Sequence, residues 1–127
     1  MLVLALVVAA VAALIHVYIF WLEAFAWATP RGLATFGMTE GQAQATKELA
    51  FNQGFYNLFL ALVTIGGVIT MALGHHAVGA ALLIAGCGSM VAAGAVLLIS
   101  SPSKAKAAVT QLITPAFALL FLLISAL

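Results

Sequence analysis

The chain has 127 residues, of which 66% are hydrophobic and 6% charged, and its mean hydropathy is +1.28. A soluble domain typically carries about 25% charged residues, so this composition excludes a soluble fold and predicts an integral membrane protein. Three acidic and four basic side chains leave a net charge of +1, which offers no electrostatic footprint for nucleic acid. The expected partner is the lipid bilayer.

Four apolar stretches of spanning length follow one another along the chain. They cover approximately residues 2–28, 44–73, 76–99 and 102–127. Because about 20 residues cross the hydrocarbon, residues 1–127 are predicted to form one all-α domain, an antiparallel, up-down bundle of four transmembrane helices. Pro30 ends the first span, Gly74 turns the chain between the second and third, and Pro102 begins the fourth.

The longest connection is expected at residues 29–43. Within it, Thr39 and Gln42 have the spacing of a capping box, so a lead-in helix could begin there and continue into the second span. The third connection, at residues 100–104, precedes the fourth span.

Basic residues mark one side of the membrane. All four lie in or beside the first and third connections: Arg31, Lys47, Lys104 and Lys106. The positive-inside rule therefore predicts that loops 29–43 and 100–104 are cytoplasmic, that both chain ends lie outside, and that the protein resides in the cytoplasmic (inner) membrane.

Polar side chains gather on one face of each of the first two spans. On the first span, helical geometry aligns His16, Glu23 and Trp27. The second span carries Asn52, Gln53, Tyr56 and Asn57 on one arc. Because lipid offers no hydrogen-bond partners, we expect these two faces to turn toward each other or toward a wet cavity.

Depth along the helices predicts two polar layers. Glu23 and the pair Asn52 and Gln53 are expected at one height, and His16 and Asn57 at another, nearer the middle of the membrane. In the fourth span, Gln111 and Thr114 approach the same two heights. Pro115 follows them and removes the helical partner of the Gln111 carbonyl, so both side chains are predicted to support the site.

Each of these polar residues has a structural interpretation as well as a functional one. Glu23 is either a carboxyl near the interface that reaches Arg31 or Lys47, or a group that binds a cation or relays protons. His16 either titrates in a functional site or only hydrogen-bonds to Asn57. The amides of the second span either hold helices together or contact a ligand, and Trp27 is either an interfacial anchor or a stacking platform.

No cofactor, metal site or catalytic motif is expected. His16 and Glu23 are seven residues apart, about 10.5 Å along a helix, which is too far for easy sharing of one ion. The adjacent His75 and His76 are more typical of a solvated turn than of a metal site. Cys87 is the single cysteine, so the chain can form no internal disulfide.

The third span carries a stripe of small residues at fourfold spacing. Its members are Ala81, Ala85, Ser89 and Ala93. Such a stripe lets another helix approach closely, so it predicts helix packing.

The residues of the first half resemble a known family. The pattern comprises Ile15-His16, Tyr18, Glu23, Trp27, Thr29-Pro30-Arg31, Phe36-Gly37, Asn52-Gln53-Gly54 and Tyr56-Asn57. It resembles the small bacterial integral membrane family catalogued as domain of unknown function 1304. The resemblance implies a four-span bundle in which the two polar helices work together, and it implies no activity.

Three hypotheses of function follow. The leading one is a membrane protein whose first two helices enclose a polar pocket that binds or passes a small polar or cationic species; it is not expected to be an enzyme. Its ligand-binding residues would be His16, Glu23, Asn52, Gln53, Tyr56 and Asn57, supported by Trp27, Gln111 and Thr114. The alternatives are an accessory subunit or homo-oligomer docked through the small-residue stripe and, third, a membrane enzyme acting on a lipid-soluble substrate.

Overall fold

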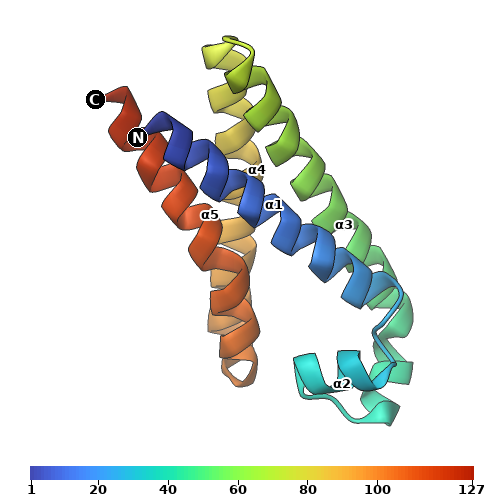
Figure 1. Ribbon diagram of the computed structural model, residues 1–127. Helices are drawn as coiled ribbons and strands as arrows, with labels where there is room; N and C mark the ends of the chain where they lie inside the picture. Colours follow the sequence, from blue (N-terminus) through green and yellow to red (C-terminus); the bar gives the residue numbers. More distant parts are fainter.

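The chain folds entirely into helices in the computed structural model, which describes residues 1–127 (Figure 1). The elements are α1 (Leu2–Ala24), α2 (Pro30–Phe36), α3 (Glu40–Ala72), α4 (His76–Ser100), the 3₁₀ helix η1 (Pro102–Lys104) and α5 (Ala105–Ala126). Four helical segments are long and apolar enough to cross a membrane: α1, α3, α4 and η1 together with α5. The predicted all-α, four-span fold is confirmed.

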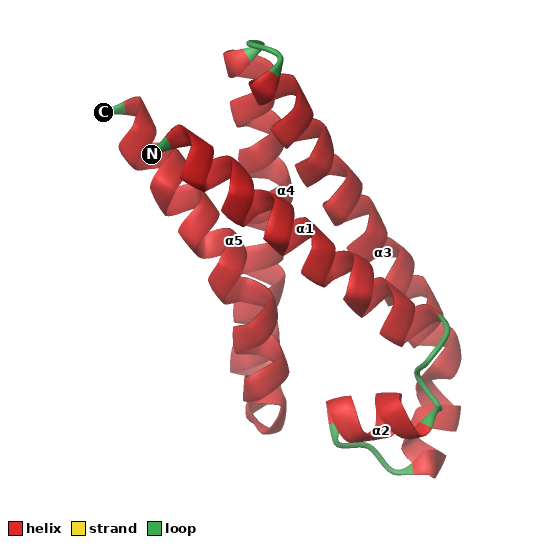
Figure 2. Ribbon diagram, in the orientation of Figure 1, coloured by secondary structure: helices red, strands yellow, loops and turns green.

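The four long helices form a closed ring of neighbours. α1 packs on α3, α3 on α4, α4 on α5, and α5 returns to α1, whereas α1 and α4 barely touch across the centre. Each helix runs antiparallel to its two neighbours, and irregular backbone is confined to the ends of the bundle (Figure 2). One end carries α2, η1 and every basic residue, and we call it the charged end. The other carries both termini and the α3–α4 turn, and we call it the terminal end.

The helices pack closely toward the terminal end because the side chains between them are small. On α1 the buried residues there are Ala5, Ala9, Ala12 and Ala13. A core cluster joins all four long helices and consists of Ala9, Met71, Leu83, Cys87 and Ala118. Small side chains let backbones approach, which is how helices associate when lipid removes the hydrophobic drive between them.

Gly86 shows how close the approach of α3 and α4 is. A Cβ atom at this position would overlap the hydroxyl oxygen of Thr64, a fully buried residue of α3. The Thr64 hydroxyl donates a hydrogen bond to the carbonyl oxygen of Leu60 at 2.9 Å, so its polar group is satisfied within its own helix. The contact therefore requires glycine for space.

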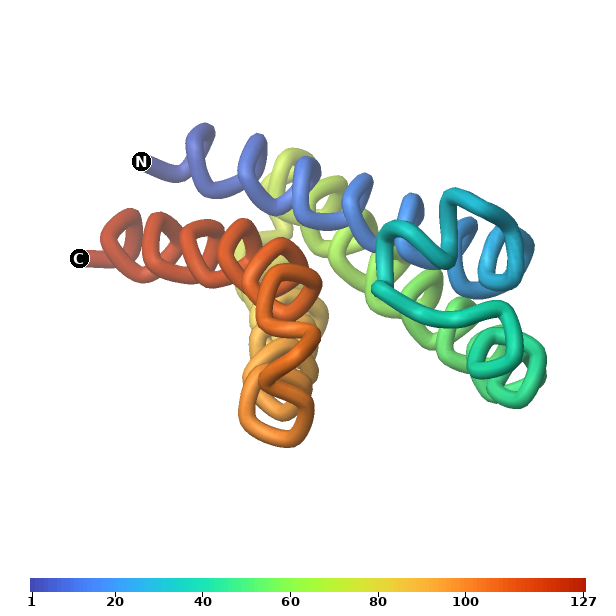
Figure 3. The backbone as a smooth tube through the Cα atoms, turned by 90° about the horizontal axis from the view of Figure 1, so that it is seen from below, coloured from blue at the N-terminus to red at the C-terminus, as the bar shows by residue number.

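Toward the charged end the two helix pairs separate. Seen from that end, the α4–α5 connection lies apart from the ends of α1 and α3, and α2 lies in front of these two ends (Figure 3). Residues that line cavities come from both sides of this opening. The bundle thus opens at its charged end into cavities with several polar side chains. At the terminal end a cavity of about 610 Å³ is lined mainly by hydrophobic residues.

The connection expected at residues 29–43 is more structured than predicted. α1 ends at Ala24, four residues earlier than expected, and α2 occupies half of the connection. Thr29 caps α2, accepting a hydrogen bond from the Gly32 N–H, and Gly37 ends it with a positive φ of 63°. α3 begins at Glu40 rather than near residue 44, because Thr39 and Gln42 form the predicted capping box.

The small-residue stripe of α4 does not pack within the chain. Its members Ala81, Ala85, Ser89 and Ala93 are all exposed. The face that α4 turns inward instead carries Gly79, Leu83, Gly86, Cys87, Met90 and Gly94. The stripe therefore lies on the outer surface of the bundle.

Candidate functional site

The centre of the candidate site is a hydrogen bond between α1 and α3. The Nδ2 atom of Asn57 donates to Oε2 of Glu23 over 2.7 Å. The same nitrogen also donates to the carbonyl of Gln53, one turn earlier on α3, at 3.2 Å. Both recorded bonds use Nδ2, so the Asn57 Oδ1 and the second carboxylate oxygen of Glu23 remain as acceptors.

Gly54 makes this contact possible. A Cβ atom on Gly54 would lie 3.0 Å from the backbone nitrogen of Ala24 and 3.0 Å from the carbonyl oxygen of Phe20. Glycine therefore lets the last turn of α1 rest directly on α3. Asn57 lies three residues beyond Gly54 on the same face, which brings its amide to Glu23.

Two cavities open beside Glu23. The first, which we call the amide cavity, has a volume of about 600 Å³ and lies between the end of α1, α2, the start of α3 and η1. Its lining includes Glu23, Trp27, Phe36, Gln42, Thr46, Gln53 and Lys104. Because its wall combines a carboxyl, two side-chain amides and an ammonium group, it can hydrogen-bond a small polar molecule.

The second cavity, which we call the seam cavity, has a volume of about 350 Å³ and lies between α1, α2 and α5, with one residue of α4. Its lining includes Ile15, Tyr18, Ile19, Leu22, Glu23, Phe36, Leu97, Lys106 and Gln111. Glu23 and Phe36 line both cavities, so the two meet at these side chains.

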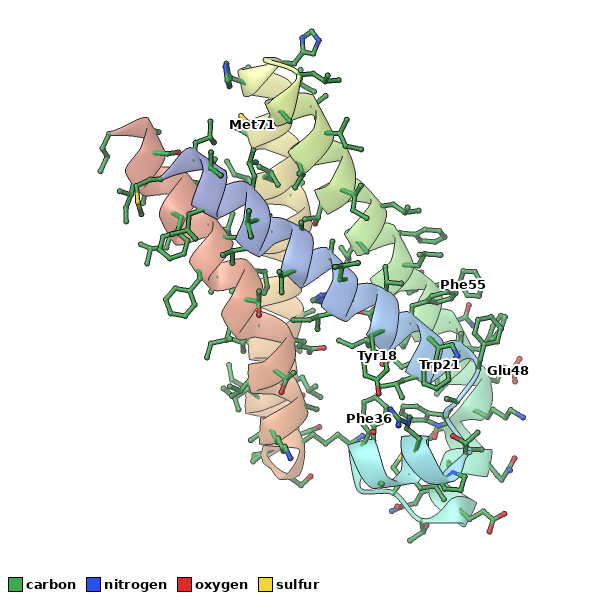
Figure 4. All side chains as sticks on the ribbon, in the orientation of Figure 1. Tyr18, Trp21, Phe36, Glu48, Phe55 and Met71 are labelled. Carbon is green, nitrogen blue, oxygen red and sulfur yellow. The ribbon has the colours of Figure 1, made fainter.

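Three contacts fix α2 and the residues that lead into it at the charged end of the site. Trp27 donates from Nε1 to the hydroxyl of Thr46 at 3.0 Å, and its ring lies 4.8 Å from that of Phe36. Arg31 donates from Nη1 to the hydroxyl of Tyr18 at 3.0 Å. Tyr18 and Phe36 lie in the space between α1 and α2 (Figure 4). These contacts hold α2 against the bundle.

His16 lies apart from this site. It is 1% exposed, its Nδ1 lies 2.9 Å from the carbonyl oxygen of Ala12 on its own helix, and it lines neither cavity. Asn57, which was predicted to lie level with His16, reaches Glu23 with its side chain instead. The alternative that His16 hydrogen-bonds to Asn57 is wrong, because the bond of the imidazole goes to the Ala12 carbonyl of its own helix.

The other predicted residues divide between the cavities and the outer surface. Gln53 and Trp27 line the amide cavity, and Gln111 lines the seam cavity. Asn52 is exposed and Tyr56 is 63% exposed, so both turn away from α1. Thr114 is half-buried and lines neither cavity.

Sequence reasoning missed several side chains of the site, among them Phe36, Gln42, Thr46, Lys104 and Lys106. They come from connections and helix starts, where the helical pattern of the spans gives no direction. The signal that was available is the clustering of all basic residues at one end of the bundle. No group of three or more His, Cys, Asp or Glu side chains comes close enough to hold a metal ion.

Comparison with known proteins identifies a family and no function. No curated protein and no solved structure matches this chain. The model of the family described as "Protein of unknown function (DUF1304)" matches residues 10–123, most of the chain. The matched region contains all four membrane-span-like helices in large part, together with every residue of both cavities named above. The chain therefore belongs to the DUF1304 family.

Proposed function

We propose that this protein resides in the cytoplasmic membrane and that its charged end holds a polar pocket, which binds or passes a small polar or cationic species. The observation that supports this proposal is the 2.7 Å hydrogen bond from Asn57 to Glu23. It joins a carboxyl of one membrane helix to an amide of the next at the wall of an open cavity. Ionisable residues within membrane segments are costly and are typical of ligand or ion pathways.

The acceptor atoms that remain free at the cavity wall indicate which kind of ligand could bind there. One carboxylate oxygen of Glu23 accepts from Asn57, which lines neither cavity, and the other oxygen remains free in the amide cavity, to which Gln53 adds a side-chain amide. An ammonium group donates up to three hydrogen bonds and is attracted to a carboxylate, so it fits this set of acceptors. Glu23 would supply the charge, and the amides would orient the ligand.

The proposal assigns binding to Glu23 and Gln53, which line the amide cavity, with Asn57 positioning the Glu23 carboxyl and with Trp27 and Gln111 in supporting positions. His16 is not part of it, because its ring is buried beside its own helix. Asn52, Tyr56 and Thr114 are left out because they line neither cavity.

Equilibrium dialysis with radiolabelled ethanolamine tests the proposal. The purified parent protein is compared with Glu23→Gln, which keeps the shape of the side chain and removes its charge. Glu48→Gln is the matched control, because Glu48 is an exposed carboxyl of α3 that points away from the cavities (Figure 4). We expect saturable binding to the parent and the control, and a loss of at least about tenfold in affinity for Glu23→Gln.

Two results would overturn the proposal. One is the absence of saturable ethanolamine binding to the parent protein. The other is equal affinity of the parent and a Glu23→Gln variant that unfolds at the same temperature as the parent.

The proposal includes an orientation, with the charged end in the cytoplasm. Its support is the position of all basic residues at that end. In a Cys87→Ala background, His75→Cys should react with a membrane-impermeant maleimide on intact cells. Gln44→Cys, at the charged end, should react only after the cells are permeabilised. The reverse pattern would contradict the orientation.

A second candidate function is a structural one, in which the protein is an accessory subunit or a homo-oligomer. The observation that favours it is the exposure of Ala81, Ala85, Ser89 and Ala93 on α4. In a Cys87→Ala background, thiol cross-linking in native membranes should join Ser89→Cys chains and leave the exposed control Ile84→Cys monomeric. Equal cross-linking at both positions, or none at either, would contradict this function.

A further inference from the structure

The two cavities that meet at Glu23 differ in character, and the difference bears on the kind of ligand. Half of the residues that line the amide cavity carry polar or charged side chains, and this cavity belongs to the charged end. The seam cavity is lined mainly by hydrophobic residues and runs along α1 toward the terminal end. A ligand that filled both would need a polar end and an apolar end.

The apolar wall of the seam cavity is long enough for a hydrocarbon chain. On α1 it extends from Glu23 to Ile15 through Leu22 and Ile19. Eight residues of helix correspond to about 12 Å, or several methylene groups of an extended chain. Leu97 of α4 completes the wall from the far side of the opening.

Cations surround the polar end of the seam cavity. Lys106 lines it directly, and Arg31 hydrogen-bonds to Tyr18, which also lines it. Since the Tyr18 oxygen accepts from Arg31, its own hydrogen remains available to donate. The side-chain amide of Gln111 adds a further donor to the same cavity. Together these groups suit the oxygens of a phosphate.

The same junction also carries the acceptors of the Glu23 and Asn57 pair. Glu23, which lines both cavities, attracts a positive group, and Lys104 and Lys106, which line one cavity each, attract a negative group. A headgroup that carries both charges satisfies both sets. The amine of such a headgroup would meet Glu23, and its phosphate would meet Lys106.

We propose that the ligand is a phospholipid whose headgroup carries a primary amine, held with its headgroup at Glu23 and one acyl chain along the seam cavity. This inference rests on the proposed function, because it names the ligand class of the same pocket. The backbones of α1 and α5 diverge toward the charged end (Figure 1), and the seam cavity lies between them.

Native mass spectrometry of the detergent-purified protein tests the proposal with three probes. They are phosphatidylethanolamine and phosphatidylglycerol, both with six-carbon chains, and the chain-free headgroup glycerophosphoethanolamine. The parent should bind phosphatidylethanolamine at least about tenfold more tightly than phosphatidylglycerol, the change expected for one charge-assisted hydrogen bond. The chain-free headgroup should bind at least about 100-fold more weakly than the lipid, because it buries no methylene groups.

Two variants test which protein side chain contacts the amine and which contacts the phosphate, and each has a matched control. Glu23→Gln should abolish the preference for the amine-bearing lipid, whereas Glu48→Gln should retain it. Lys106→Gln should lower the affinity for both lipids by a similar factor of about ten, because it removes the cation that would contact the phosphate. Lys47→Gln should leave the affinity for both lipids unchanged, since Lys47 is exposed and lines neither cavity.

The outcomes separate this inference from the proposed function. Equal affinity of the parent for the two lipids, or equal affinity for the lipid and the chain-free headgroup, would overturn the lipid assignment. Binding of ethanolamine or of the chain-free headgroup in that case would leave the proposed function standing. If neither ethanolamine nor any of the three probes bound, both proposals would fall.

Discussion

The terminal half of the bundle and its charged half are built from different side chains. Toward the terminal end, alanines and glycines lie between the helices, and a Cβ atom at Gly86 would already overlap Thr64. Toward the charged end, aromatic and ionisable side chains such as Trp27, Phe36 and Lys104 lie between them and line cavities. Small side chains hold the helices together in the terminal half, which we call the closed half, and its one large cavity is lined mainly by hydrophobic residues. In the charged half, which we call the open half, the cavities include the ionisable and amide groups of the candidate site.

This comparison predicts that substitutions in the closed half will act on stability and those in the open half on binding. The largest effect is expected for Gly86→Ala, because the added methyl group has no space beside Thr64. Overpacking of this kind should lower the free energy of unfolding by about 3 kcal/mol. Equilibrium unfolding in mixed detergent micelles measures it.

Gly88→Ala is the matched control, two residues away on α4. A Cβ atom there meets nothing within 4 Å, so alanine should leave stability unchanged or raise it by up to about 1 kcal/mol through helix propensity. Equal stability of the two variants would show that α3 and α4 are not closely packed at Gly86.

His16→Ala is expected to have the next largest effect. The imidazole is fully buried, so its removal leaves a cavity and should cost about 2 kcal/mol of stability. Leu14→Ala on the same helix is the control, because Leu14 is 65% exposed and should change stability by less than about 0.5 kcal/mol. Ethanolamine affinity should be unchanged in both variants. A loss of ethanolamine affinity in a folded His16→Ala protein would show that His16 contributes to ligand binding.

The outcome for His16 illustrates what the sequence could predict. Hydropathy and turn residues were sufficient for the four long helices, since spanning a bilayer leaves few other solutions for such apolar stretches. The polar face of α1 was also identified, and Glu23 does meet an amide of α3. Relative heights were not predictable, because they depend on how two helices cross, and that is set by contacts such as the one at Gly54.

The amide arc of α3 shows a second limit. Successive residues advance by about 100°, so the arc from Asn52 to Asn57 is too wide for all its members to face α1. Gly54 marks the contact line. Asn52 and Tyr56 each lie two residues from it, about 200° around the helix, and are exposed; Asn57 lies three residues from it and faces α1. The glycine was thus the signal that could have separated the two asparagines.

A double-mutant cycle on Glu23 and Asn57 should give a smaller effect. Their hydrogen bond of 2.7 Å joins a carboxyl to an amide, and its removal should cost about 1.5 kcal/mol of coupling energy. The same cycle with Asn52→Ala is the control and should give no coupling, because Asn52 faces outward. Unfolding in mixed micelles again measures both. Similar couplings for the two asparagines would contradict the assigned orientation of α3.

The smallest expected effect concerns the docking of α2. Trp27→Phe keeps a ring that can stack on Phe36 and removes the hydrogen bond to Thr46, so it should cost about 0.5 to 1 kcal/mol. That loss should be local and should appear as a few-fold faster hydrogen exchange of α2 amides, with no change in the exchange of the closed half. Trp21→Phe is the control, because Trp21 is 44% exposed on α1 and makes no bond to α3. Because α2 covers only the charged end, exchange that accelerated throughout the bundle would mean that the two halves unfold together, and the distinction between a packed half and an open half would be lost.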